Sequence, residues 1–139
     1  MSDRAGENAI GVIVLADDDD DLRAVYAEFL RASGFQVVEA EDGLKTLDRV
    51  REVRPHLLVL DLWMPGLNGL EVLERLRHEP VSTRMKVIML SNVGEADVRL
   101  EAFEGGAISY MVKGIALENV LEHVRLALAT HLAVLIDPD

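Results

Sequence analysis

Five polar residues directly follow apolar segments that are typical of buried strands: Asp17, Asp18, Asp61, Ser91 and Lys113. Three carboxylates in one place repel one another, because two unit charges about 4 Å apart at an effective dielectric constant of about 20 cost about 4 kcal/mol. A hard divalent cation offsets this repulsion, and Mg²⁺ suits a few carboxylates with room for water and a phosphate. A lysine adds a point charge for the phosphate. The set predicts a metal-assisted phosphate site, if the fold brings its members together.

These residues also have ordinary structural interpretations. Asp61 is consistent with a cap on the turn that Pro65-Gly66 predicts. The run Asp17–Asp21 is consistent with capping of the following helix, where negative charge meets the positive end of the dipole. One or two aspartates suffice for that role, and Asp19–Asp21 are the expected caps. The five polar residues indicate a functional site, rather than ordinary turn and capping roles, only if the fold places them close together.

Apolar runs and helical periodicity alternate along the chain and predict five strands and five helices. The expected strands cover residues 12–16, 36–40, 57–60, 86–90 and 108–112. The expected helices cover about 22–33, 43–52, 67–78, 95–104 and 117–128, with a loop over 79–84. In the second helix Leu44, Leu47 and Val50 are expected to face inward. Such alternation predicts a parallel sheet with helices on both faces, because each parallel connection needs a crossover.

The strand order follows from the composition of each strand. The runs VIVLA, LLVL and VIML are uninterrupted, whereas QVVEA and ISYMV carry polar residues that suit edge strands. The order consistent with this pattern is 2-1-3-4-5, which makes the chain a single (βα)5 flavodoxin-like α/β domain. In this topology the carboxyl ends of the strands bring the five polar residues to one edge of the sheet.

Composition narrows the range of functions. The chain has 139 residues, a net charge of −11 and no cysteine, and its four histidines (His56, His78, His123 and His131) form no ligand-like cluster. The acidic balance argues against direct nucleic-acid binding, and no apolar run approaches the roughly 20 residues that a membrane span needs. We expect a cytoplasmic protein with a flexible tail over residues 1–9, one domain over 10–130 and an extension over 131–139.

Four motifs in order resemble bacterial response-regulator receiver domains of the chemotaxis-regulator type. They are IVLADDDDDLR (13–23), LLVLDLWMPGLNGLEVL (57–73), VIMLS (87–91) and YMVK (110–113). The resemblance covers about residues 11–129, and it implies a phosphoacceptor domain of two-component phosphorelay signalling. Such a domain receives a phosphoryl group from a histidine kinase or a phosphotransfer protein and is not a conventional enzyme.

The resemblance also assigns roles at the site. Asp61 is expected to be the phosphoacceptor, and Asp18 and Asp61 are expected to ligate Mg²⁺ directly, with Mn²⁺ as a possible substitute. The backbone carbonyl of Trp63 is the expected third protein ligand, and Asp17 acts through water. Lys113 is expected to contact the phosphoryl oxygens.

The switch that the resemblance implies involves Ser91 and Tyr110. The hydroxyl of Ser91 is expected to move to the phosphoryl group while Tyr110 turns inward behind it. The face formed by the fourth helix, the fifth strand and the last helix then changes, and a downstream protein or a second copy of the chain binds there. An ordinary half-buried edge-strand tyrosine is the alternative interpretation of Tyr110.

One position departs from the family pattern, and two others are expected to influence how fast the phosphorylated form is hydrolysed. Gly114 follows the lysine where proline with a cis bond is usual, which puts the cis geometry in doubt. Trp63 and Val93 occupy positions that influence hydrolysis of the acyl phosphate, and their bulk predicts slow autodephosphorylation.

Two other classes of function compete with the phosphoacceptor. A degenerate receiver that serves as a phosphorylation-independent interaction scaffold is disfavoured because all five site residues are retained. An aspartyl phosphatase of the haloacid dehalogenase type is weaker still, since such enzymes carry a second aspartate where this chain has Trp63.

Overall fold

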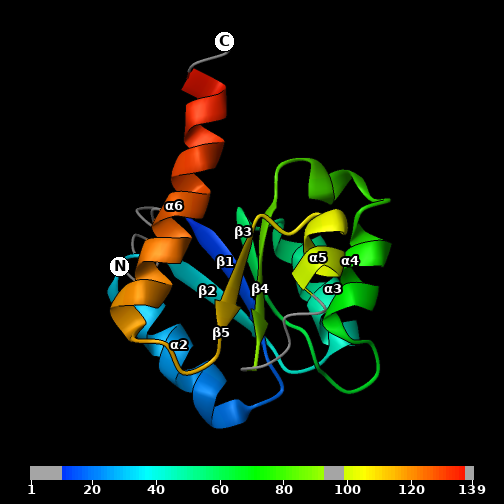
Figure 1. Cartoon of the computed structure of the whole chain (residues 1–139), viewed down its shortest axis with the longest axis horizontal. Coiled ribbons are helices and arrows are strands. Elements are labelled where there is room, and N and C mark those ends of the chain that lie inside the picture. The colour runs from blue at the N-terminus through cyan, green and yellow to red at the C-terminus, as the bar shows by residue number, and fades with distance from the viewer. Residues whose placement is uncertain (1–10, 93–98, 137–139) are drawn as a thin grey trace.

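The computed structural model describes residues 11–92 and 99–136, with side chains as far as Ala129. Strands and helices alternate throughout this part of the chain (Figure 1). The strands are β1 Val12–Ala16, β2 Gln36–Ala40, β3 Leu57–Asp61, β4 Lys86–Ser91 and β5 Ser109–Val112. The helices are α2 Asp20–Ala32, α3 Gly43–Val53, α4 Gly69–Leu76, the short 3₁₀ helix η1 Pro80–Thr83, α5 Arg99–Glu104 and α6 Leu117–Ile136.

The five strands form one parallel sheet in the order β2-β1-β3-β4-β5, which confirms the predicted flavodoxin-like topology. The registers align the carboxyl ends of the three central strands: Ala16 pairs with Leu60, and Asp61 pairs with Leu90. Ser91 pairs with Val112, the last residue of β5. The polar residues that follow these strands therefore emerge at a common edge.

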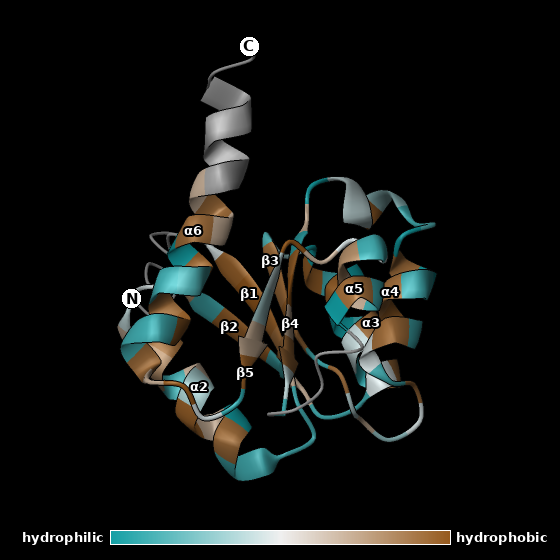
Figure 2. Cartoon of the chain, viewed as in Figure 1, coloured by the Kyte–Doolittle hydropathy of each residue, from teal (hydrophilic) through white to brown (hydrophobic). Residues whose placement is uncertain are grey.

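Helices cover both faces of the sheet (Figure 1). Because successive strand residues point to opposite faces, Ile13 and Leu15 contribute to one core while Val14 and Ala16 contribute to the other. The first core includes residues of α2 and α6, and the second includes residues of α3, α4 and α5. In Figure 2 the central strands are hydrophobic, and the helices carry hydrophilic residues on their outer surfaces. Aliphatic packing on two sides thus holds the central strands rigidly.

Helix caps agree with the predicted use of the aspartate run. Asp19 is the N-cap of α2, and its side chain accepts hydrogen bonds from the backbone N–H groups of Asp21 and Leu22. Asp20 and Asp21 lie in the first turn, where they complement the helix dipole. Asp17 and Asp18 precede the N-cap, so their side chains are not the cap of α2.

Some local expectations were wrong. The segment expected to be a loop over 79–84 contains η1, which begins at Pro80 because proline suits the first position of a helix. Leu44 is 58% exposed rather than inward-facing, since α3 turns Leu47 and Val50 to the core.

Helix α6 runs without interruption across residue 130, where we expect the domain to end and the extension to begin. In Figure 1 its last turns project beyond the sheet and the other helices. Among residues 11–92 and 99–136, no helix is both long enough and apolar enough to cross a membrane.

Candidate functional site

The carboxyl edge of the sheet buries two carboxylates. Asp17, directly after β1, is fully buried, and Asp61, the last residue of β3, is 1% exposed. The backbone N–H of Asp17 donates to the carbonyl oxygen of Ala40, and that of Leu62 donates to Leu90 O, at 3.1 and 2.8 Å. Hydrogen bonds to neighbouring strands therefore fix the backbone on which both side chains stand.

Asp18 completes a cluster of three acidic side chains. One carboxylate oxygen from each of Asp17, Asp18 and Asp61 lies within 4.8 Å of the others. Lys113 comes from the end of β5, and its Nζ lies 3.2 Å from Asp17 Oδ1 and 3.0 Å from Asp61 Oδ2. The structure thus brings together four of the five residues that the sequence analysis placed at this edge.

Two carboxylate oxygens in the cluster accept no hydrogen bond from any described residue. Asp17 Oδ1 accepts one from the backbone N–H of Asp19, but Asp17 Oδ2 has no such partner. Asp61 Oδ2 also has no hydrogen-bond partner, although it forms an ion pair with Lys113 Nζ at 3.0 Å. Buried carboxylate oxygens need a compensating partner. An all-oxygen donor set of this kind fits a hard divalent cation, so these carboxylates could hold a metal ion.

The electrostatics follow from burial and from the packing of like charges. Burial raises the pKa of Asp61 to about 7, the charge of Asp17 adds to the rise, and Lys113 opposes it. Burial alone lowers the pKa of Lys113, but its contacts with Asp61 and the charge of Asp17 outweigh burial and raise this pKa. Lys113 is therefore a permanent positive charge, whereas Asp61 titrates near neutral pH.

Ser91 and Tyr110 lie next to this cluster and contact each other. Ser91 is fully buried at the end of β4, and its Oγ forms a hydrogen bond with the hydroxyl of Tyr110 on the neighbouring strand. The guanidinium of Arg99, the first residue of α5, lies 4.7 Å from the centroid of the Tyr110 ring. Tyr110 therefore connects the strand that ends in Ser91 with helix α5.

Trp63 contacts the acidic cluster through its backbone, whereas Gly114 affects only the turn that follows Lys113. Trp63 is 51% exposed, and its backbone N–H donates to Asp61 Oδ1 at 3.3 Å. The described residues contain no cis peptide bond, and Gly114 adopts a φ of 91° that favours glycine. This trans Lys113–Gly114 bond resolves the doubt about the turn. Val93 lies outside the described residues.

Two positioning residues escaped the sequence analysis. Gly69 begins α4 so close to β3 that an added Cβ would lie 2.5 Å from the carbonyl oxygen of Asp61. The signal was present in Asn68 and Glu71, which form a capping box around this helix start. Arg23 donates from Nη1 to the backbone carbonyl of Asp17 at 2.7 Å, and its position one turn into α2 gave no sequence signal.

Comparisons with known proteins agree with this geometry. The family model described as "Response regulator receiver domain" matches residues 13–125. Sporulation initiation phosphotransferase F of Bacillus subtilis is 31% identical over 113 residues, covering 81% of this chain and 90% of that protein. A solved response regulator receiver domain protein from Methanospirillum hungatei superposes with a TM-score of 0.81 at 22% identity, over 88% of this chain and 97% of that one, and supports the fold.

Another relative is longer. The DNA-binding dual master transcriptional regulator RpaA of Synechocystis is 31% identical over 113 residues, which are 81% of this chain but 47% of that protein. The chain thus spans about half the length of several proteins that it matches. The expectation that nucleic acid is not a partner therefore finds no support in the comparisons. With a family model that covers most of its length, the chain belongs to the response regulator receiver domains of two-component signalling.

Proposed function

We propose that this chain is a phosphoacceptor, in which Asp61 receives a phosphoryl group from the phosphohistidine of a histidine kinase or a phosphotransfer protein. The observation that carries the proposal is the contact of Lys113 Nζ with the buried carboxylates of Asp17 and Asp61 at 3.2 and 3.0 Å. A fixed ammonium at this place stabilises the negative charge on the oxygens of a transferred phosphoryl group. Membership of the receiver family supports the same conclusion.

The acidic cluster supports a divalent cation, Mg²⁺ or in its place Mn²⁺, as the cofactor. We assign Asp18, Asp61 and the backbone carbonyl of Trp63 as direct ligands, and Asp17 as a ligand through water. When bound, the cation supplies charge neutralisation for the phosphoryl oxygens. The two buried oxygens without a hydrogen bond, Asp17 Oδ2 and Asp61 Oδ2, are the groups that most need it.

In the transfer step, a carboxylate oxygen of Asp61 forms a bond to phosphorus as the phosphorus–nitrogen bond of the phosphohistidine breaks. The electron pair of the broken bond stays on the imidazole nitrogen of the donor. Asp61 must be ionised to attack, and its raised pKa means that nearby positive charge is needed at neutral pH. Lys113 supplies part of that charge and holds the carboxylate in place.

Phosphorylation gives Asp61 a charge of roughly −1.5 to −2 and strong acceptor oxygens. We propose that the hydroxyl of Ser91 then donates to the phosphoryl group and that Tyr110 follows this change. Because Tyr110 contacts both Ser91 and Arg99, the change reaches the face formed by α5, β5 and α6. A downstream protein, or a second copy of the chain, binds this face.

Receiver domains are in general not conventional enzymes, although they assist loss of their own phosphoryl group. We propose that Trp63 and Val93 keep water from an in-line approach, so that the phosphorylated form decays slowly. The half-exposed indole of Trp63, two residues after Asp61, supports this role. A phosphorylated lifetime of only seconds would contradict it.

Mass spectrometry after incubation with acetyl phosphate and Mg²⁺ tests the proposed function. The native chain should gain the mass of one phosphoryl group, and Asp61→Asn should gain none. Asp48→Asn is the matched control, since Asp48 is exposed on α3, and it should behave as the native chain does. A gain that survives in Asp61→Asn would refute the assignment.

A scaffold that acts without phosphorylation is the remaining alternative, and no observation favours it. Beryllofluoride with Mg²⁺ separates the two functions, since a scaffold would show no Mg²⁺-dependent change. The fluorescence of Trp63, the single tryptophan, provides the measurement next to Asp61.

A further inference from the structure

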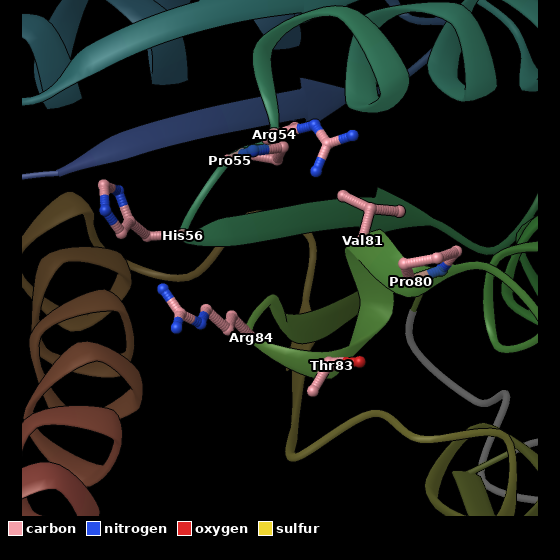
Figure 3. A pocket seen from close by; sticks show the side chains of 7 residues that line it. All are labelled: Arg54, Pro55, His56, Pro80, Val81, Thr83 and Arg84. Carbon is pink, nitrogen blue, oxygen red and sulfur yellow. The ribbon is translucent and has the colours of Figure 1, made fainter.

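A second polar cluster lies at the opposite edge of the sheet, around a hollow of about 370 Å³ (Figure 3). The residues that line it come from two segments far apart in the sequence. One is the connection between α3 and β3, residues 54–56, and the other is η1 with the residue that follows it, within residues 80–84. The hollow therefore adjoins the amino end of β3, whereas Asp61 ends that strand.

The charged residues in this hollow are all basic. Arg54 and Arg84 both line it, in a chain whose net charge is −11. Their side chains form no hydrogen bond or ion pair with any residue of the part that the structure describes. Two unpaired guanidiniums around one hollow form a local positive site, because both always carry charge.

Nearby acidic residues do not neutralise these arginines. Glu52, two residues before Arg54, pairs with Arg49 at 3.4 Å. Glu79, directly before η1, accepts two hydrogen bonds from Arg51, at 3.0 and 2.7 Å. The acidic side chains closest in sequence are thus paired with other arginines, and the charge of the hollow remains available to a ligand.

His56 adds a hydrogen-bond donor. Its Nδ1 accepts a hydrogen bond from the backbone N–H of Val12 at 3.0 Å, so the proton of the neutral ring is on Nε2. In Figure 3 the guanidinium of Arg84 is directed toward the side of the hollow where His56 lies. Imidazole and guanidinium groups both donate to anionic oxygen, and guanidinium does so in the two-pronged geometry that phosphate accepts.

The rest of the lining is mainly apolar. Pro55 is buried beneath the hollow, and Pro80 and Val81 line it from η1 (Figure 3). A volume of this size falls within the range of about 300 to 1,000 Å³ that is common for sites of small molecules. Apolar walls with a few hydrogen-bond donors around them suit a ligand that has an apolar part and an anionic part.

We propose that this hollow binds a small organic phosphate, such as a nucleotide, whose phosphate groups contact Arg84 and His56 Nε2 on one side of the hollow, while Arg54 adds positive charge from the other side. The apolar part of the ligand packs on Pro80 and Val81. The site is independent of Asp61 and of the phosphoacceptor function, because the two lie at opposite ends of β3.

Titration of the full chain with adenosine diphosphate, followed by amide NMR spectra, tests the proposal. The titration uses the Asp61→Asn variant with a chelator present, which removes Mg²⁺ binding at the carboxyl edge of the sheet. Failure of the proposed phosphoacceptor function therefore does not affect the result. Amide signals of residues 54–56 and 80–84 should move in a saturable manner. Saturable shifts that are confined to the carboxyl edge, or no saturable shift at all, would overturn the proposal.

Two further probes identify the ligand chemistry. Pyrophosphate should bind the same residues more weakly than adenosine diphosphate, because it lacks a part that packs on the apolar wall. Citrate should bind less well than pyrophosphate. Equal or tighter binding of citrate would overturn the assignment to phosphate.

Substitutions provide the last test. Arg84→Gln should raise the dissociation constant of adenosine diphosphate by about tenfold, since a charge-assisted hydrogen bond is lost. Arg54→Gly should have a similar effect while the fold stays intact, because Arg54 has a φ of 48° that glycine adopts without strain. Arg75→Gln, on the exposed side of α4, is the control of equal charge and should leave binding unchanged. Equal weakening by all three variants would show attraction to net charge only and refute the site.

Discussion

The two edges of the sheet use charge in opposite ways. At the carboxyl edge, Asp17 and Asp61 are buried and share one ammonium, Lys113 Nζ. At the amino edge, the basic side chains of Arg54 and Arg84 are exposed and have no acidic partner among the described residues. At the carboxyl edge, burial holds the side chains in place and shifts the pKa values of Asp61 and Lys113. At the amino edge, the arginines are exposed to solvent and contribute positive charge around a hollow. In the two proposals made above, the first arrangement serves phosphoryl transfer and the second serves reversible binding of a ligand.

Gly69→Ala should break the carboxyl edge most severely. The new Cβ would lie 2.5 Å from the carbonyl oxygen of Asp61, so α4 or the end of β3 must move. We expect a loss of about 2–3 kcal/mol in the free energy of unfolding, measured by urea denaturation. Gly105→Ala, where the nearest atom is at 3.3 Å, is the control and should cost clearly less. Equal losses in the two variants would show that the close approach to Asp61 is not special.

Mg²⁺ should stabilise the folded chain by binding at the carboxyl edge, where the acidic cluster lies. At about 30 times its dissociation constant, a cation that binds only the folded chain stabilises it by about 2 kcal/mol. Thermal unfolding should show this gain for the native chain, and Asp18→Asn should lose most of it. Asp21→Asn, in the exposed first turn of α2, should retain it. Retention of the full gain in Asp18→Asn would remove Asp18 from the cluster.

Asp61→Asn should stabilise the chain in the presence of a chelator, by about 1–2 kcal/mol near pH 8. The pKa of Asp61 is raised from 3.8 to about 7, so the folded state binds this proton more tightly than the unfolded state. Its contribution to stability is complete below about pH 4 and is lost as the pH rises to about 7. The gain from Asp61→Asn should therefore grow over this interval and level off above it. Urea denaturation from pH 5 to pH 8 measures the trend.

At the amino edge the expected change in the free energy of unfolding is the smallest, and it is a gain in stability that involves no loss of phosphorylation. Arg54→Gly should raise the free energy of unfolding by about 0.5–1 kcal/mol, because a left-handed conformation costs a non-glycine residue more than the extra freedom of glycine in the unfolded chain. Calorimetry measures this gain. Phosphorylation of Asp61 should be unchanged in the variant. A loss of stability would mean that the Arg54 side chain holds the fold together.

Most of the fold could be predicted because apolar content differs so clearly between strands. The polar residues of QVVEA and ISYMV placed these strands at the edges, and the sheet has them there. Placement of Asp17, Asp61 and Lys113 at one edge followed from that topology and is observed. Their roles in phosphoryl transfer came from the family resemblance and remain proposals.

Other features depend on contacts that sequence patterns do not contain. The close approach of Gly69 to β3 depends on how α4 enters the sheet, and only the capping box of Asn68 and Glu71 hinted at it. The outward position of Leu44 reflects the rotation of α3 about its axis, which one leucine cannot specify. The basic hollow joins residues 54–56 to residues 80–84, and neither segment alone forms a motif.

Strand β3 also acts as an electrical spacer. Its five residues, at about 3.3 Å each, separate the hollow from Asp61 by about 16 Å, which is twice the screening length of about 8 Å in physiological salt. Two unit charges at that separation interact by only about 0.3–1 kcal/mol. An anion held at one end would therefore barely disturb ionisation at the other, and the chain can carry two oppositely charged sites on one strand without either neutralising its counterpart.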